Sequence, residues 1–336
     1  MSEVSRVVPK VPSAIGAAWR RLGLVMSPPG GALTNSHAML PTPLVRNDRI
    51  RVYFTSCDAD WRGRIFRVDF RRDDPRQIID FDPAPVLDLG EAGGFDADGV
   101  NPSQIVERDG RLYLFYIGWQ RHSADIPYTL LAGLAVSDDG GLHFERVSRR
   151  PMLAPRSGEE YFRTAPYVYR SETGWVMLYI GGGTFFTDAA GKRLPRYSLR
   201  HTASPDGFDW SGPSTELLSP DPAKGEIGFG RPVLWHETGC PAIMLSLRTE
   251  TGYVLATRRL EPGGEWTPVL DAGTAEWERE MTCFGAPCMV GDQEILFYNG
   301  SRFGLTGFGA AVRPAQPSPG RPFEDRLVKH LAHLAA

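Results

Sequence analysis

The chain of 336 residues has room for one large all-β domain or two ordinary domains, and its 42% hydrophobic and 23% charged residues are typical of a globular protein. A formal net charge of −3 provides no basic face for a nucleic acid, and no apolar run is long enough to span a membrane. The chain start lacks the apolar core of a secretory signal, and the four cysteines lack zinc-type spacing. We therefore expect a cytoplasmic protein with reduced thiols that binds neither nucleic acids nor membranes.

The first predicted element is a strand within residues 19–28, which contains Trp19 and the apolar residues before Met26. Its composition resembles that of a later segment that begins at Trp266. The last repeat of the chain lacks an outer strand of its own, so we expect residues 19–28 to complete it. Such pairing would remove exposed strand edges, which promote aggregation.

Five segments with a common pattern follow along the chain. Each has a proline in a short apolar strand, then a turn, then a second strand rich in aromatic and β-branched residues. The prolines lie 55 to 66 residues apart, at Pro41, Pro102, Pro166, Pro232 and Pro287. Third strands are predicted at residues 64–70, 131–137, 197–203, 253–259 and 307–312. A period of this length indicates stacked units of about four strands each.

Turn signals and the C-terminal pattern complete the predicted fold. Residues 137–144 and 204–210 place Asp and Gly before an aromatic residue, which favours hairpins into an outer strand. Apolar spacing at residues 323–335 predicts a short C-terminal helix. The predicted fold is an all-β, five-bladed β-propeller in a single domain over residues 1–336, with its ring closed by the N-terminal strand. Its blades start near residues 37, 98, 162, 228 and 283.

Carboxylates recur in the loops that lead into the first strands. Six or seven residues before the proline stand Asp96, Glu160, Glu226 and Glu280, whereas the first unit has Asn35 there. Strand formation does not require an acid at this position. Loops that enter the inner strands of a propeller crowd around its axis, so we expect these side chains to face one central funnel that holds a ligand.

Further polar side chains lie closer to the first strands. They are His37, Asp98, Asn101, Arg163, Arg231 and Cys283. His37 and Asp98 each lie four residues before their proline. The two arginines could bind an anionic group or neutralise the acids as structural ion pairs. His37 and Asp98 could also hold a metal, but the sequence identifies no further ligands, and we expect neither a metal nor a cofactor.

Paired acids in one funnel suit the cleavage of a glycosidic bond, because one protonates the leaving oxygen while the other activates water or attacks carbon. The base would be His37 or Asp98, and the acid would be Glu160, Glu226 or Glu280. Aromatic residues such as Trp119 would provide faces for sugar rings. The expected partner is therefore a sugar or another small molecule.

Several stretches resemble the five-bladed propellers of glycoside hydrolase families 43 and 32. They are SHAMLPTPLV from Ser36, DGVNPSQIV from Asp98, LFYIGW from Leu114, EMTCF from Glu280, FYNG from Phe297 and TGFG from Thr306. The resemblance covers roughly residues 30–312 and implies the propeller fold and a glycosidase-like activity. The sequence looks closer to intracellular propeller proteins that accompany genes for sugar polymers or specialised metabolites.

The first unit departs from the family pattern. Family 43 enzymes have a general-base Asp at the start of blade one, a second Asp in blade two and an acidic Glu in blade three. Asp98 or Asp96 matches the second acid and Glu160 the third, but blade one has only Asn35 and His37. Three functions remain open: a glycosidase-like enzyme with His37 as base, a non-hydrolytic lyase or cyclase that uses the same funnel, and a binding protein without turnover.

Overall fold

The computed structural model describes residues 19–171, 173–188, 190–237, 240–260, 263–270 and 273–315. These residues form 20 strands, a 3-10 turn η1 (Pro222–Lys224) and one helical turn α1 (Ser301–Gly304). Within the described ranges, no helix has the length and apolar character needed to cross a bilayer. The helix predicted at residues 323–335 lies outside the described residues.

The strands form five groups of four that follow one another along the chain. The first three groups are β2 (Ser36–Val45), β3 (Arg49–Cys57), β4 (Gly63–Arg71) and β5 (Ile78–Leu87); β6 (Gly99–Arg108), β7 (Arg111–Arg121), β8 (Tyr128–Ser137) and β9 (Glu145–Arg146); and β10 (Phe162–Ser171), β11 (Gly174–Thr187), β12 (Arg193–Ser204) and β13 (Thr215–Leu218). The fourth is β14 (Glu226–Glu237), β15 (Cys240–Thr249), β16 (Tyr253–Arg259) and β17 (Thr267–Pro268). The fifth contains β18 (Cys283–Val290), β19 (Gln293–Asn299), β20 (Phe308–Pro314) and, from the other end of the chain, β1 (Arg20–Met26).

Strand pairing within each group is antiparallel, and β1 joins the fifth group through β20. Its register places Arg20 opposite Val312 and Met26 opposite Phe308. Short parallel pairs, β4 with β6 and β8 with β10, link the first three groups into one continuous sheet. These links lie at the start of the first strands, so they fix how neighbouring groups meet.

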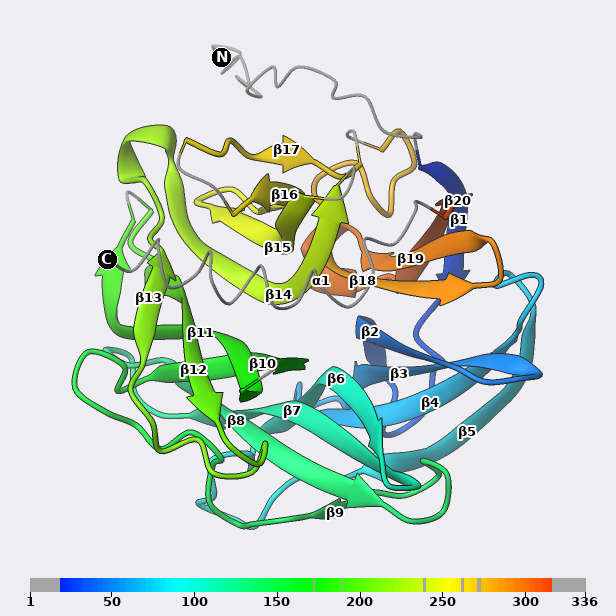
Figure 1. Cartoon of the computed structure of the whole chain (residues 1–336), viewed down its shortest axis with the longest axis horizontal. Coiled ribbons are helices and arrows are strands. Elements are labelled where there is room, and N and C mark those ends of the chain that lie inside the picture. The colour runs from blue at the N-terminus through cyan, green and yellow to red at the C-terminus, as the bar shows by residue number, and fades with distance from the viewer. Residues whose placement is uncertain are drawn as a thin grey trace.

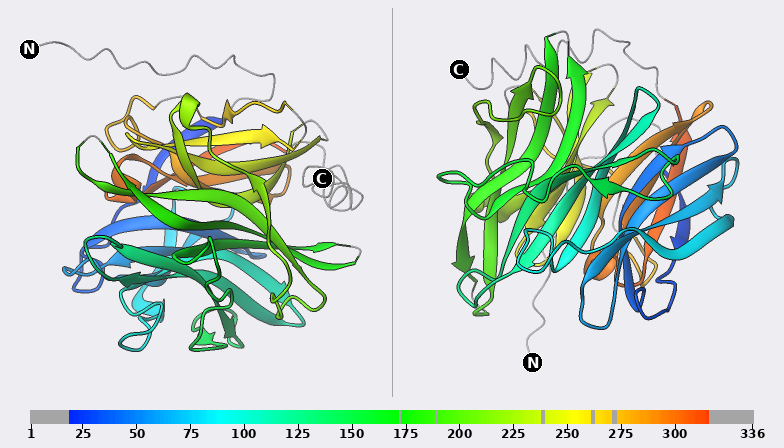
Figure 2. Two further views of the ribbon diagram at one scale, coloured as in Figure 1. Left: turned by 90° about the vertical axis from the view of Figure 1, so that its left-hand side faces the viewer. Right: turned by 90° about the horizontal axis from the view of Figure 1, so that it is seen from below.

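The five groups surround a common centre, with the first strand of each group innermost (Figure 1). Contacts run from β2 to β6, β10, β14 and β18 in turn, and β18 contacts β2. Views from the side and from below show neighbouring groups packed against one another face to face (Figure 2). The molecule therefore has a propeller-type arrangement in which loops from distant parts of the sequence meet at one place.

Five hydrophobic clusters lie between neighbouring strand groups. Between the first and fifth groups, for example, Phe54 and Phe70 pack against Phe308, with ring centroids 5.8 and 6.2 Å apart. Burial of each such ring contributes about 1.5–3 kcal/mol. Second strands such as β3 are buried on both faces, which explains their aromatic and β-branched sequences.

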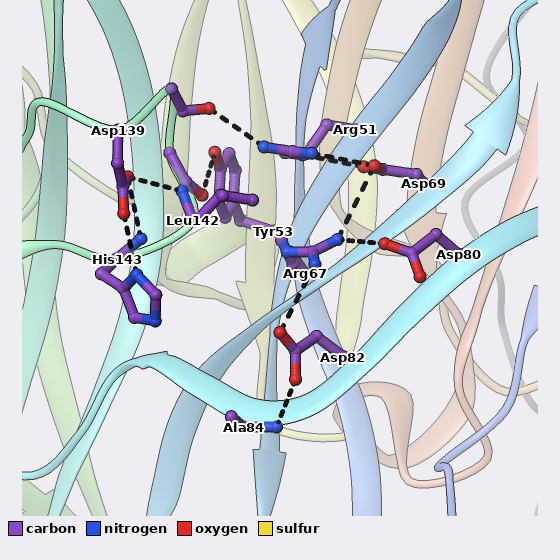
Figure 3. A network of polar contacts seen from close by, with 12 residues as sticks. Arg51, Tyr53, Arg67, Asp69, Asp80, Asp82, Ala84, Asp139, Leu142 and His143 are labelled. Carbon is purple, nitrogen blue, oxygen red and sulfur yellow. Dashed lines mark hydrogen bonds and ion pairs between the residues drawn. The ribbon is translucent and has the colours of Figure 1, made fainter.

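A polar network connects the first group to the second at the periphery (Figure 3). Arg51 binds Asp69 through two N–H groups and donates a third hydrogen bond to the Gly140 carbonyl at 3.0 Å. Tyr53 donates to the neighbouring Gly141 carbonyl at 2.9 Å. Asp139, in the same turn, accepts hydrogen bonds from the Ser137 hydroxyl, the His143 ring and two backbone N–H groups, and these bonds outweigh burial and hold the pKa of its carboxyl well below the usual range. The Asp-Gly turn at residues 137–144 thus holds two groups together.

Candidate functional site

A cavity of about 460 Å³ lies where the first strands meet, and residues from all five groups line it. The first strands contribute His37, Asn101, Thr164, Arg231 and Phe284. We call this space the central cavity. Its volume is in the range of small-molecule sites, roughly 300–1,000 Å³. A second space of about 370 Å³, the rim cavity, shares wall residues with it: His37, Trp61, Lys192, Leu194, Arg248, Tyr253 and Phe303.

The backbone is irregular around the central cavity. Each first strand has a register shift where it approaches the cavity. Most non-glycine residues with positive φ in the described part line this cavity: His37, Leu40, Trp61, Ala165, Arg231, Phe284 and Phe303. A left-handed backbone costs such residues about 1–2 kcal/mol each. Bulges re-aim side chains, and strain of this kind is typical of functional sites, so the fold bends its inner strands to present these residues to the cavity.

Asp98 is the only carboxylate among the described residues that line the central cavity. It lies directly before β6 and is half-buried. Its backbone N–H donates to the Trp119 carbonyl at 3.1 Å, and its carboxylate accepts the backbone N–H of Arg121 at 2.8 Å. The carboxylate is thus fixed by β7 while it remains open to the cavity.

His37 lies at the start of β2 and lines both cavities. The imidazole is buried, packs edge-on against Trp61 with ring centroids 5.3 Å apart, and has Nδ1 3.0 Å from Ser36 Oγ. Burial, and to a lesser extent the charge of Arg302, lowers the pKa of His37. The ring is therefore neutral at pH 7 and able to accept a proton. In the described part of the chain, no group of three or more potential ligand side chains could hold a metal ion.

Cations dominate the charged wall of the central cavity. They are Arg121, Lys192, Arg193, Arg231 and Arg248. Arg231 is almost completely buried and donates to the Pro41 carbonyl and to Thr42 Oγ1, both at 2.7 Å. Further bonds reach the carbonyls of Ser103 and Phe284. Burial lowers the pKa of Arg231 to about 9, so the guanidinium still carries its charge at neutral pH.

Aromatic and unpaired polar groups complete the wall. Trp61 is 61% exposed, and Trp119 packs on Tyr128 with ring centroids 4.8 Å apart. Four wall residues each have a buried polar atom without a hydrogen-bond partner among the described residues: Asn101 Oδ1, Trp119 Nε1, Thr164 Oγ1 and Arg231 Nε. An unpaired buried polar atom costs about 1–3 kcal/mol. The wall therefore offers both apolar faces and polar atoms to a ligand.

Of the four predicted loop acids, Asp96 alone belongs to a repeated cluster, whose members in two other groups are Glu159 and Glu278. In three groups a buried acid accepts a hydrogen bond from a tyrosine hydroxyl 20 residues later: Asp96 from Tyr116 at 2.9 Å, Glu159 from Tyr179 at 2.7 Å and Glu278 from Tyr298 at 2.6 Å. The acids also pair with arginines, namely Arg146, Arg163 and Arg21. Burial raises the pKa of all three tyrosines, so they remain protonated donors. These clusters tie the entering loop to the second strand and do not line the central cavity.

The structure brings together about half of the residues predicted for the site. His37, Asp98, Asn101, Trp119 and Arg231 line the central cavity, and Glu280 lines the adjoining rim cavity. Both Asp98 and Glu280 therefore face spaces that meet at His37. Asp96 and Arg163 instead belong to the acid–tyrosine clusters.

The remaining predicted residues lie away from the cavity wall. Glu160 is exposed and accepts the backbone N–H of Gly158, and Asn35 is exposed. Glu226 is buried and accepts the backbone N–H of Asp221 at 2.9 Å. Cys283 is buried, and burial raises the pKa of its thiol. Glu160 and Glu226 thus bind loop backbone, and Cys283 fills the core.

A second set of wall residues, none of them predicted for the site, lies in the connection between the second and third strands and at the adjoining strand ends. Trp61, Arg121, Lys192, Arg193, Arg248 and Tyr253 come from this connection in four groups. The signal that could have found them is positional, because the same connection in each group ends beside the central cavity. Their sequences share no common residue, so alignment on the prolines does not reveal them.

Comparison with known proteins supports the fold. No protein-family model matches the chain. Two uncharacterised proteins from strains of Mycobacterium tuberculosis, MT1551 and Rv1502, are each 27% identical over 304 residues, which cover 88% of this chain and 99% of theirs.

Solved structures of carbohydrate-active proteins share the fold at low sequence identity. A glycosyl hydrolase from Bacteroides ovatus has a TM-score of 0.64 at 13% identity and covers 91% of this chain and 98% of its own. A thermostable family-43 glycoside hydrolase has a TM-score of 0.59 at 13% identity, with 88% and 97% covered. The β-1,2-mannobiose phosphorylase from Listeria innocua, in complex with β-1,2-mannobiose, has a TM-score of 0.65 at 10% identity, with 96% and 99% covered. The chain thus shares the fold of these proteins.

Proposed function

We propose that this protein is an enzyme that cleaves a glycosidic bond in its central cavity, with Asp98 as the proton donor. The observation that carries the proposal is that Asp98 is the one carboxylate among the described wall residues of that cavity. The scaffold is shared with glycoside hydrolases and with a mannobiose phosphorylase, whose structure holds a disaccharide. In this role, Asp98 protonates the leaving oxygen as the bond to the anomeric carbon breaks.

The second catalytic group would be His37 or Glu280. His37 is neutral because burial and Arg302 lower its pKa, so it can take the proton of an attacking water molecule. Glu280 is exposed and lines the rim cavity, which also contains His37. A neutral imidazole in the first group would replace the blade-one aspartate of family 43 enzymes.

The rest of the wall is suited to a saccharide. Aromatic faces such as Trp61 and Trp119 pack well against the apolar faces of sugar rings. Sugar hydroxyls both donate and accept, so they could pair with Asn101 Oδ1, Thr164 Oγ1 and the indole N–H of Trp119. Each such bond would offset part of the cost of an unpaired buried group.

The architecture belongs to the same proposal. We treat the five strand groups as the blades of one propeller domain whose ring is closed by the pairing of β1 with β20. Closure would keep the five entering loops at fixed separations, which general acid catalysis requires. A cytoplasmic site of action, without a metal or other cofactor, is also part of this proposal.

Turnover of glycosides is the direct test. Wild-type protein and Asp98→Asn would be assayed with a panel of nitrophenyl glycosides and unlabelled disaccharides. We expect at least one substrate to be cleaved by the wild type and the Asn variant to be slower by about 10²–10⁴-fold. Glu160→Gln, which changes an exposed carboxylate outside the cavity, serves as the matched control. Equal rates for Asp98→Asn and wild type would refute the role of Asp98, and saturable sugar binding without any turnover would favour a binding protein.

A further inference from the structure

The cavity wall holds more positive charge than glycosidic cleavage of a neutral sugar requires. Its cations, Arg121, Lys192, Arg193, Arg231 and Arg248, face a single carboxylate, that of Asp98. The chain as a whole has a net charge of −3, so this concentration of cations is local. Like charges around one cavity repel each other, and low-dielectric walls strengthen that repulsion.

Arg248, at the end of β15, is held in place by aromatic residues. Its Nη1 donates to the Tyr197 hydroxyl at 2.6 Å, and its guanidinium lies 5.6 and 5.5 Å from the ring centroids of Tyr197 and Tyr253. No carboxylate of the described chain forms an ion pair with it. The nearby phenols, led by Tyr197, raise the pKa of Arg248 against the effect of burial, so its charge is permanent.

Lys192 and Arg302 extend this charge to the rim cavity. Lys192 is exposed on the turn between β11 and β12, lines both cavities and has no ion pair with the described residues. Arg302 lines the rim cavity from a left-handed backbone position, with φ 55° and ψ 41°. Two exposed acids, Glu250 and Glu280, also face the rim cavity. The excess of cations over carboxylates is therefore greatest in the wall of the central cavity.

We infer that Arg248 and Lys192 form a subsite for an anionic group of the substrate, either a phosphate ester or a sugar carboxylate. This inference rests on the proposed function, because it names the substrate class of the same cavity. A guanidinium presents N–H groups in a fork that fits two oxygens of a phosphate or carboxylate, whereas an ammonium adds a mobile point charge. The bond from Tyr197 and the flanking rings set the direction of that fork in advance. The substrate is thus an acidic saccharide.

Equilibrium binding tests the subsite without turnover. Isothermal titration calorimetry would compare glucose 1-phosphate, glucuronate, inorganic phosphate and neutral glucose on wild-type protein at low and high salt. We expect the anionic sugars to bind at least about tenfold more tightly than glucose, with an affinity that falls as salt rises. The anion that binds most tightly then shows whether the subsite prefers a phosphate ester, a sugar carboxylate or free phosphate.

Variants locate the binding. Arg248→Gln and Lys192→Met should each weaken the anion about tenfold or more, while binding of neutral glucose stays unchanged. Arg196→Gln, which removes an exposed cation from the same strand as Arg193 but not from the wall, should bind like the wild type. If Arg248→Gln does not fold, Arg248→Lys and Lys192→Met test the subsite instead. Arg248→Lys keeps the positive charge and loses the guanidinium fork.

Three results would overturn the inference: glucose binding as tightly as both glucose 1-phosphate and glucuronate, wild-type affinity in both Arg248 and Lys192 variants, or no saturable binding of any of the three anions. These outcomes are independent of the proposed reaction. Anion binding that persists in Asp98→Asn, together with wild-type rates in that variant, would reject only the catalytic role of Asp98. Glycoside cleavage without anion preference would reject only the subsite.

Discussion

Asp96 and Asp98 lie two residues apart in the loop before β6, yet they belong to different regions of the molecule. Asp96 is buried and bound by Tyr116 and Arg146, in a cluster that recurs in two other strand groups. Asp98 faces the central cavity. At its position relative to the proline the other groups have His37, Phe162, Gly228 and Cys283. An acid that repeats from group to group therefore marks repeated structure, and the unrepeated acid marks the candidate site.

The largest expected effect concerns the cavity acid. Asp98→Asn should reduce the rate of glycoside cleavage by about 10²–10⁴-fold and leave sugar affinity close to that of the wild type, because the amide keeps the shape and loses the transferable proton. The free energy of unfolding should stay within about 0.5 kcal/mol, since the carboxylate forms no buried ion pair within the described part of the chain. Steady-state kinetics and urea unfolding of the same preparation measure both quantities. A stability loss without a rate loss would place Asp98 with the structural acids.

The acid cluster of the third group should show the opposite behaviour. Glu159→Gln leaves the fully buried Arg163 without its carboxylate, and breaking a buried pair in this way costs about 3–5 kcal/mol of unfolding free energy. Urea denaturation measures the loss. Glu160→Gln is the adjacent control, because this side chain is exposed and its change should stay within about 0.5 kcal/mol. Equal stability of the two variants would contradict the structural role of the cluster.

Asp96→Asn should have a smaller effect of the same kind. Its partner Arg146 is partly exposed, with a side chain 21% accessible, so solvent can compensate some of the lost charge. The expected loss is about 1.5–3 kcal/mol, the range for hydrogen bonds to charged groups. Thermal unfolding followed by circular dichroism measures it, and the rate per folded molecule should equal that of the wild type. A variant of normal stability that had lost turnover would move Asp96 to the catalytic site.

The smallest expected effect is a change in the titration of His37. Burial, and secondly Arg302, lowers its pKa from 6.5, so Arg302→Gln should raise the pKa towards that value. In the wild type, the imidazole of the unfolded chain takes up its proton at a higher pH than that of the folded chain. The free energy of unfolding therefore falls as the pH drops through 6.5. The variant should lose less stability in this range. NMR titration of the imidazole provides the measurement, and an unchanged or lower pKa would show that Arg302 does not act on His37.

Much of the fold followed from sequence periodicity, because each repeated proline lies in a first strand of the structure. These prolines, from Pro41 to Pro287, fall in β2, β6, β10, β14 and β18. The same alignment led to four of the wall residues: His37, Asp98, Asn101 and Arg231. Trp119 was predicted as an aromatic face for a sugar ring. These four residues lie in or directly before a first strand, so the strand fixes their positions, whereas the loop acids farther from the proline reach different places.

The sequence did not distinguish neighbouring acids. Glu159 is buried, whereas Glu160 points to solvent, and in the fifth group Glu278 rather than Glu280 binds the tyrosine. A shift of one residue reverses the direction of a side chain near a strand, and the bulges add such shifts. The cations between second and third strands could not be predicted either, because these connections differ in length and share no residue.

The central claim, that a saccharide binds beside Asp98 in the central cavity, is tested most directly by a crystal structure of Asp98→Asn with a sugar identified in the substrate or binding screen. We predict a sugar ring packed on Trp61 or Trp119, with its glycosidic oxygen within hydrogen-bond distance of Asn at position 98. A sugar bound instead among the acid–tyrosine clusters, or on the outer surface of the strand groups, would contradict the account.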